Sequence, residues 1–171
     1  MISEKMQQML NEQVQKEFYS AYLYLSMEAY LASKNLDGFA NFFHVQAQEE
    51  RDHAMMFFNH IIKVGGKVSL TQINTPKIDF KSPEEVFGDA LEHEKFVTKS
   101  IYSLVDAAMA EHDYTTNTFL QWFVNEQAEE EATMDNNLKR LQLVGNNGGA
   151  ILMIDAELAK RVYTPPAVNQ A

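Results

Sequence analysis

Acidic side chains interrupt the apolar face of each of four long helix-forming segments. Helical periodicity places Glu17, Glu50, Glu94 and Glu130 on faces that are otherwise built from leucine, valine, phenylalanine and similar residues. A buried carboxylate is costly unless ion pairing or a metal ion compensates for its burial. Because basic side chains are missing from the same faces, the four positions together indicate a metal site.

The spacing around Glu50 indicates which kind of metal site these acids could form. Residues 50–53 form a Glu-x-x-His motif, which puts the Glu50 carboxylate and the His53 imidazole on one helical face. Di-metal carboxylate bundles combine one glutamate from each of two helices with Glu-x-x-His from the others. In this chain the remaining candidates are Glu17, Glu94, Gln127 and Glu130. Such ligands suit Fe(II), Mn(II) or Zn(II), and Glu50 could bridge two ions, but the pattern does not choose the metal.

Distances along the chain place the four acids at one level. Glu17 lies 18 residues before position 35 and Glu50 lies 15 after it (35 − 17 and 50 − 35). Glu94 lies 19 residues before position 113 and Glu130 lies 17 after it (113 − 94 and 130 − 113). If turns fall at these positions, near-equal separations bring the partners within about one helical turn, or about 5 Å. We therefore expect the acids to meet in one layer.

The segments that carry these acids have recognisable ends. Ser3 and Ser82 are suitable N-cap residues, and Pro83 fits a first helical position. Gly65 and Gly66 end the second segment, and an Asn-Asn-Gly-Gly run at 146–149 ends the fourth. We expect a single all-α domain over 1–171, with helices at about 4–32, 38–64, 83–111, 114–144 and 150–162.

The connection between the second and third helices predicts the topology. Residues 66–81 are 16 residues (81 − 66 + 1), too many for a simple helix turn. Fully extended, they reach about 50 Å, whereas a helix of about 28 residues is about 42 Å long. The segment can therefore cross the whole bundle, which gives two antiparallel hairpins joined by one long crossover.

Composition excludes several classes of function. The 171 residues carry a formal net charge of −10, so nucleic acid is not an expected partner. The absence of cysteine excludes disulfides, iron–sulfur clusters and thiolate zinc sites. The N-terminus has no apolar signal core, and no apolar run reaches membrane-spanning length. We expect a cytoplasmic protein with no membrane partner.

With these features the chain strongly resembles non-haem ferritin of the prokaryotic type over nearly its entire length. The matching positions are Glu17, Tyr24, the Glu-Glu-Arg-Asp-His run at 49–53, Glu94, and the Glu-Gln-Ala-Glu-Glu run at 126–130. The resemblance implies a ferritin-like four-helix bundle with a short fifth C-terminal helix. It also implies iron storage and detoxification by a ferroxidase, which oxidises Fe(II) with O2 or peroxide and deposits ferric mineral inside a shell of 24 copies. An unidentified reductant would release the iron.

The resemblance also assigns roles to residues. Glu17, Glu50 and His53 would hold a first iron, and Glu50 would bridge to a second held by Glu94 and Glu130, with Gln127 nearby. Tyr24 would hydrogen-bond near this centre and serve as an electron source. A third iron site would use Glu130 together with Glu49, Glu126 and Glu129. No haem is expected. Bacterioferritin would have histidine in place of Glu130, and rubrerythrin-like proteins need cysteine.

Two other interpretations remain open from the sequence. A di-iron or di-manganese oxidase or oxygenase acting on a small organic substrate would use the same ligands, but it would need a substrate pocket beside the metals. A purely structural bundle would pair its buried acids with one another and would take up no metal.

Overall fold

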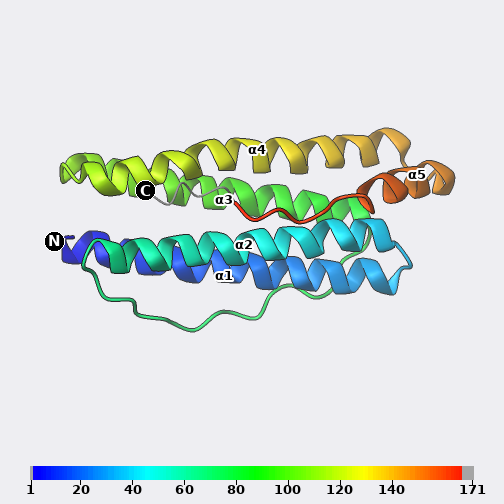
Figure 1. The fold of residues 1–171 in the computed structure, drawn as a ribbon. Helices are drawn as coiled ribbons and strands as arrows, with labels where there is room; N and C mark the ends of the chain where they lie inside the picture. The colour runs from blue at the N-terminus through cyan, green and yellow to red at the C-terminus, as the bar shows by residue number, and fades with distance from the viewer. Residues whose placement is uncertain (1, 167–171) are drawn as a thin grey trace.

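The computed structural model describes residues 2–166, and within them the chain forms five helices and no strand. They are α1 (Glu4–Ser33), α2 (Asp37–Lys63), α3 (Pro83–Ala110), α4 (Tyr114–Val144) and α5 (Gly148–Leu158). Figure 1 shows two antiparallel hairpins, α1 with α2 and α3 with α4, stacked as two layers. The all-α bundle with a short fifth helix is therefore confirmed.

Side-chain caps set the first turns of the long helices. The Ser3 hydroxyl accepts a hydrogen bond from the Met6 N–H at 3.0 Å, and the Ser82 hydroxyl accepts one from the Glu85 N–H at 3.1 Å. Helix α2 differs, because the residue before it, Leu36, offers no side-chain cap. Here the Phe39 N–H donates to Asp155 of α5 at 2.9 Å, so a distant element caps this helix.

The crossover, residues 64–82, runs along α1 for the length of the bundle (Figure 1). Asn11 holds its first part: the side-chain oxygen accepts from the Ser69 N–H at 2.7 Å, and the amide donates to the Lys67 carbonyl at 3.0 Å. Further along, the Ser26 hydroxyl donates to the Lys77 carbonyl at 2.7 Å. These hydrogen bonds therefore fix the crossover along α1.

The core consists of two apolar clusters with a polar layer between them. One cluster contains the buried aromatic residues Phe39, Phe43 and Phe87, and the other is centred on Phe57 and Phe123. The buried polar residues include Gln13, Glu17, Gln46, Glu50, His53, Glu94, Gln127 and Glu130. The two clusters provide rigid walls for this layer.

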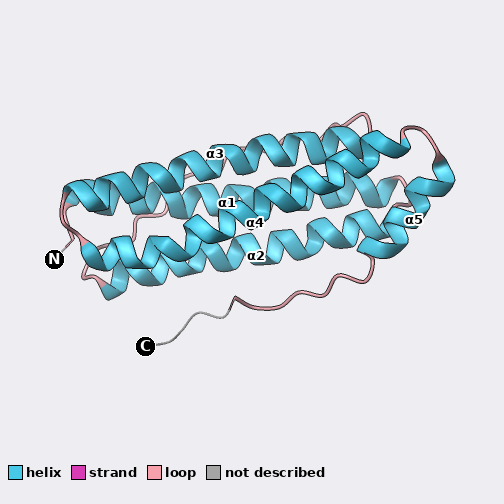
Figure 2. Ribbon diagram, turned by 90° about the horizontal axis from the view of Figure 1, so that it is seen from above, coloured by secondary structure: helices cyan, strands magenta, loops and turns pink. Residues whose placement is uncertain are grey.

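The fifth helix has different ends from those predicted at 150–162. It begins at Gly148, because the Asn147 side chain caps it by accepting from the Ala150 N–H at 3.1 Å. It ends at Leu158, where the Asn41 amide donates to the carbonyls of Leu158 at 3.2 Å and Arg161 at 2.9 Å. The chain after Leu158 turns back toward α2 (Figure 2).

The contact between α2 and α5 predicts a large effect at Gly38. A Cβ atom there would lie 1.7 Å from the Asp155 carbonyl oxygen, so Gly38→Ala must displace α5. We expect a loss of about 2 kcal/mol in the free energy of unfolding, as for other overpacked sites. The matched control is Gly88→Ala in α3, where an added Cβ meets nothing within 4 Å and should stabilise by about 0.5–1 kcal/mol. Equal thermal stability of the two variants would contradict the assigned contact.

Candidate metal centre

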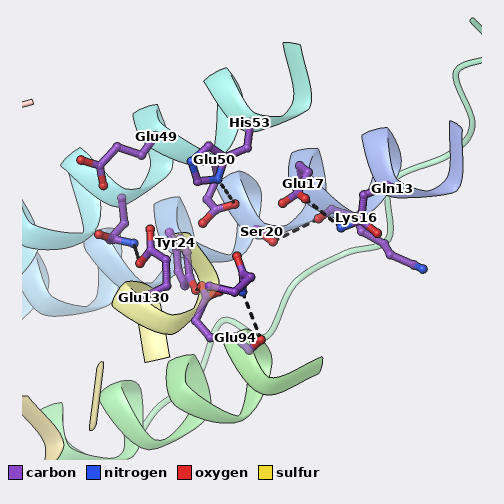
Figure 3. A network of polar contacts seen from close by, with 12 residues as sticks. Gln13, Lys16, Glu17, Ser20, Tyr24, Glu49, Glu50, His53, Glu94 and Glu130 are labelled. Atoms are coloured by element: carbon purple, nitrogen blue, oxygen red, sulfur yellow. Dashed lines mark hydrogen bonds and ion pairs between the residues drawn. The ribbon is translucent and has the colours of Figure 1, made fainter. Parts of the chain in front are cut away.

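The polar layer gathers side chains from all four long helices midway along the bundle (Figure 3). Glu17 comes from α1, Glu50 and His53 from α2, Glu94 from α3, and Glu130 from α4. Each is at most 5% exposed. The structure therefore brings together the five residues that the sequence predicts as principal ligands.

The tightest group is Glu17, Glu50 and His53. Each offers one ligand atom, and these atoms lie within 4.8 Å of one another. His53 Nδ1 is 3.4 Å from Glu50 Oε2, and the ring packs edge-on against Trp122, with centroids 5.4 Å apart. Glu17 Oε2 is buried and has no hydrogen-bond partner. An unpartnered buried oxygen beside an imidazole and a second carboxylate suits a cation.

Glu94 is held from two sides. The Tyr24 hydroxyl donates to Glu94 Oε1, and the Gln127 amide donates to Glu94 Oε2 at 2.9 Å. The same amide lies 3.3 Å from the Thr98 hydroxyl. Gln127 therefore contacts a candidate ligand directly.

Glu130 has a separate support. The Gln46 amide donates to Glu130 Oε2 at 2.8 Å. Within the described residues, neither Glu94 nor Glu130 forms a three-ligand group with Glu50 at the 4.8 Å spacing. These two carboxylates are instead hydrogen-bonded by Tyr24 and Gln127 (Glu94) and by Gln46 (Glu130).

Burial raises the pKa values of these acids, and repulsion between them adds to the shift at Glu50, Glu94 and Glu130. Burial raises the pKa of Glu94 to about 7 and that of Glu130 to about 8. The pKa of Glu50 is raised well above its ordinary value, first by burial and then by the charges of Glu94, Glu17 and Glu130. Burial also raises the pKa of Glu17. A bound cation would offset both causes and displace the protons.

Tyr24 stays protonated in this environment. Burial, followed by the charges of Glu94, Glu50 and Glu130, raises its pKa well above the ordinary value. The phenol is fully buried and donates to Glu94. It therefore lies against the acids that the sequence predicts as iron ligands.

The three acids predicted for a further iron site lie beside this layer and are less buried. Glu49 is ion-paired with Arg161, whose Nη2 lies 2.6 Å from Glu49 Oε2. Glu126 is partly buried and Glu129 is exposed. Burial raises the pKa of both Glu49 and Glu126. In the described part of the chain these acids do not form a group with ligand atoms within 4.8 Å of one another.

Sequence reasoning missed Gln13 as a supporting residue. Its amide donates to Glu17 Oε1 at 2.8 Å, and its own oxygen accepts from the Ser100 hydroxyl at 2.6 Å. Lys16 donates to the same hydroxyl at 2.7 Å. This series of hydrogen bonds fixes Oε1 of Glu17 and leaves the other oxygen, Oε2, available to a ligand. Its only sequence signal was the position of Gln13 one helical turn before Glu17.

Removing this support should weaken metal binding. In Gln13→Leu the Glu17 carboxylate loses its fixed orientation, and we expect a roughly tenfold rise in the Kd for cobalt(II), typical for loss of a residue that orients a ligand. The matched control is Gln8→Leu, on the exposed side of the same helix. Optical titration of the metal-free protein measures both. A Kd equal to that of the wild type in Gln13→Leu would contradict the orienting role.

Two cavities in the described part of the chain lie away from the candidate ligands. One, of about 410 Å³, lies between α1 and α3 and is lined by residues such as Lys16, Phe96 and Ser100. The other, of about 200 Å³, lies under the crossover beside Phe18 and Leu70. Neither is lined by His53 or the buried carboxylates.

Within the described residues, no helix is both long and apolar enough to cross a membrane.

Comparison with known proteins identifies the family. The model of the ferritin-like domain family matches residues 7–144. The bacterial non-heme ferritin of Staphylococcus aureus strain MRSA252 is 37% identical over 163 residues, covering 95% of this chain and 98% of the relative. The bacterial non-heme ferritin of Campylobacter jejuni is 39% identical over 155 residues, covering 91% of this chain and 93% of the relative.

Solved structures agree with this assignment. A humanized archaeal ferritin superposes with a TM-score of 0.95 at 47% identity, covering 96% of this chain and 100% of that one. The open-pore ferritin of Archaeoglobus fulgidus superposes with a TM-score of 0.94 at 46% identity, covering 95% and 99%. The resemblance and the ferritin-like fold inferred from the sequence are confirmed. The chain belongs to the ferritin family of iron-storage proteins.

Proposed function

We propose that this chain is a ferroxidase subunit that detoxifies and stores iron. The observation that carries the proposal is the layer of four buried carboxyl groups and one imidazole, in which Glu17 Oε2 has no partner. Fe(II) is the substrate, and it would bind where these groups converge. Its positive charge would replace the protons that the metal-free acids retain.

The proposed roles of the acids are those implied by the ferritin family, and the grouping of Glu17, Glu50 and His53 supports the first of them. Glu17, Glu50 and His53 would hold one Fe(II), and Glu50 would bridge to a second held by Glu94 and Glu130, with Gln127 alongside. Two Fe(II) ions supply two electrons, which reduce O2 to peroxide or peroxide to water. The Fe(III) ions then hydrolyse, release protons and leave as ferric mineral. Carboxylates can change between terminal and bridging binding as the metal charge rises.

Two further roles remain proposals. Tyr24 would supply an additional electron during oxidation, and its hydrogen bond to Glu94 supports this role. Glu49, Glu126 and Glu129, together with Glu130, would bind a third iron on its way out of the centre. Their lower burial is consistent with a transit position rather than with a closed site.

Storage requires an enclosed volume, which we propose is a shell of 24 copies. Large apolar side chains remain exposed on the single chain, among them Met109, Tyr114, Leu143 and, on α5, Leu152 and Met153. Exposed apolar side chains on several helices support the proposal that these helices pack against further copies of the chain. The fifth helix would contribute to a symmetry axis, and an external reductant would be needed to release the iron.

Aerobic addition of excess Fe(II) to metal-free protein, followed by size-exclusion chromatography, tests the proposal. We expect ferric iron to co-elute with a large assembly at far more than two ions per chain. A small species that holds two metals while the surplus precipitates would refute storage. That outcome would favour the di-iron or di-manganese oxidase or oxygenase, although the two cavities described do not provide it with a substrate pocket beside the ligands.

A further inference from the structure

The segment that follows α5 is fastened to α2 at three points. The Asn41 amide donates to the carbonyls of Leu158 and Arg161, at 3.2 and 2.9 Å. The Arg161 side chain forms an ion pair with Glu49, and the Tyr163 hydroxyl donates to Asp52. Figure 2 shows this segment leaving α5 and passing beside α2. We call residues 159–166 the C-terminal strap.

Arg161 makes the ion pair among these attachments. Its Nη2 lies 2.6 Å from Glu49 Oε2, and its guanidinium carbon lies 4.4 Å from the centre of the Phe42 ring. The side chains of Arg161 and Glu49 are only 26% and 21% exposed. A charge-assisted hydrogen bond combined with stacking on an aromatic ring, both partly shielded from water, holds a guanidinium firmly.

Glu49 lies at the edge of the metal centre. It precedes Glu50 on α2, and its charge contributes to the raised pKa of Glu130. Burial and Glu126 raise the pKa of Glu49, whereas Arg161 and His53 lower it. Arg161 therefore provides at this carboxylate the positive charge that a metal ion would otherwise provide.

We propose that Arg161 is a resident cation that competes with metal ions for Glu49, so that the C-terminal strap closes one side of the metal centre until cations displace it. The inference rests on the proposed function, because the competing ions would be iron leaving the centre. It predicts that the chain binds two metal ions tightly, and that the third site gains affinity only when the strap is released.

Zinc(II), which is redox-inert, tests this by calorimetric titration of the assembled metal-free protein. We expect two tight ions per chain in the wild type and a third in Arg161→Gln, bound about tenfold more tightly than any third ion of the wild type. The matched control Lys160→Gln removes the neighbouring exposed cation and should leave the wild-type isotherm unchanged. The double variant Arg161→Gln/Glu49→Gln should lose the third ion again. An unchanged third affinity in Arg161→Gln would overturn the proposal.

The position of the strap can be followed independently of metal stoichiometry. The chain has no cysteine, so Thr164→Cys, at an exposed strap position, takes a single nitroxide label. We expect restricted motion in the metal-free protein, greater motion on adding Arg161→Gln, and the same increase when excess zinc(II) is added to the protein with wild-type Arg161. A label equally mobile with and without Arg161 would overturn the strap. Loss of the two tight ions with the strap intact would instead contradict the proposed ferroxidase centre.

Discussion

Glu50→Gln should slow Fe(II) oxidation by about 100-fold or more while leaving the metal-free protein at least as stable as the wild type. Glu50 is in the tightest ligand group and is the proposed bridge, so its loss affects both metal positions. In the folded metal-free chain, burial and the charges of three neighbouring acids raise the pKa of Glu50 well above its ordinary value, which disfavours the charged form. Glutamine has nearly the same shape and carries no charge. We expect it to stabilise the metal-free fold by about 1–3 kcal/mol at pH 8.

The matched control for this experiment is Glu92→Gln in α3. Its side chain is 74% exposed and pairs only with Lys95 among the ion pairs described, so neither oxidation nor stability should change appreciably. Stopped-flow measurement of ferric absorbance and thermal denaturation of chelator-treated protein provide the two readouts. Normal oxidation in Glu50→Gln would rule out the bridge. Strong destabilisation with no change in metal binding would favour a purely structural layer of paired acids.

The parts of this molecule that could be predicted are those determined by neighbours in sequence. Ser3 and Ser82 are N-caps, and each acts on an N–H three residues later. The length of the crossover left few ways to join the hairpins. The acids were recognisable because carboxylates on an apolar stripe are expensive, and equal distances from the turns put them at one level. These arguments need only helical geometry and the cost of burying charge.

The contacts that could not be predicted join residues far apart in sequence. Asp155 caps α2 across 116 positions, and Arg161 reaches Glu49 across 112. The fifth helix was predicted to continue to residue 162 because the local sequence permits it. Asn41, on another helix, instead takes up the terminal carbonyls. Such partners become visible only when the packing of α5 on α2 is known, since neither helix carries a local signal for the other.

Packing also determines how Glu17 and Glu94 differ in their hydrogen bonding within the centre. Glu17 has one oxygen hydrogen-bonded by Gln13 and the other without a partner, whereas Glu94 is hydrogen-bonded on both oxygens. The sequence presents both as a glutamate on an apolar face. Their different supports indicate that the position near Glu17 and His53 is more open to a first cation. At Glu94 a cation would share each oxygen with the hydrogen bond from Tyr24 or from Gln127.

The metal-free protein should lose stability as the pH rises from 5 to about 8.5, the opposite of what ion-paired surface acids would cause. Glu94 has a pKa of about 7 in the folded chain against an ordinary value of 4.5. Between these values the folded state binds more protons than the unfolded state, so the free energy of unfolding falls with rising pH. For Glu94 alone the fall is about 3 kcal/mol, and Glu130, with a pKa of about 8, extends it upward.

Calorimetry of chelator-treated protein across this range should show Tm falling by about 10 °C from Glu94 alone and further from Glu130, given the usual ~2–4 °C per kcal/mol for a chain of this length. Saturating zinc(II) should remove the fall, because the bound ions offset the charges that the rising pH creates. The double variant Glu94→Gln/Glu130→Gln should also flatten it without metal. A metal-free Tm that rises between pH 5 and 8.5 would mean that the buried acids are already ionised and paired, which would remove the electrostatic basis for metal binding at this layer.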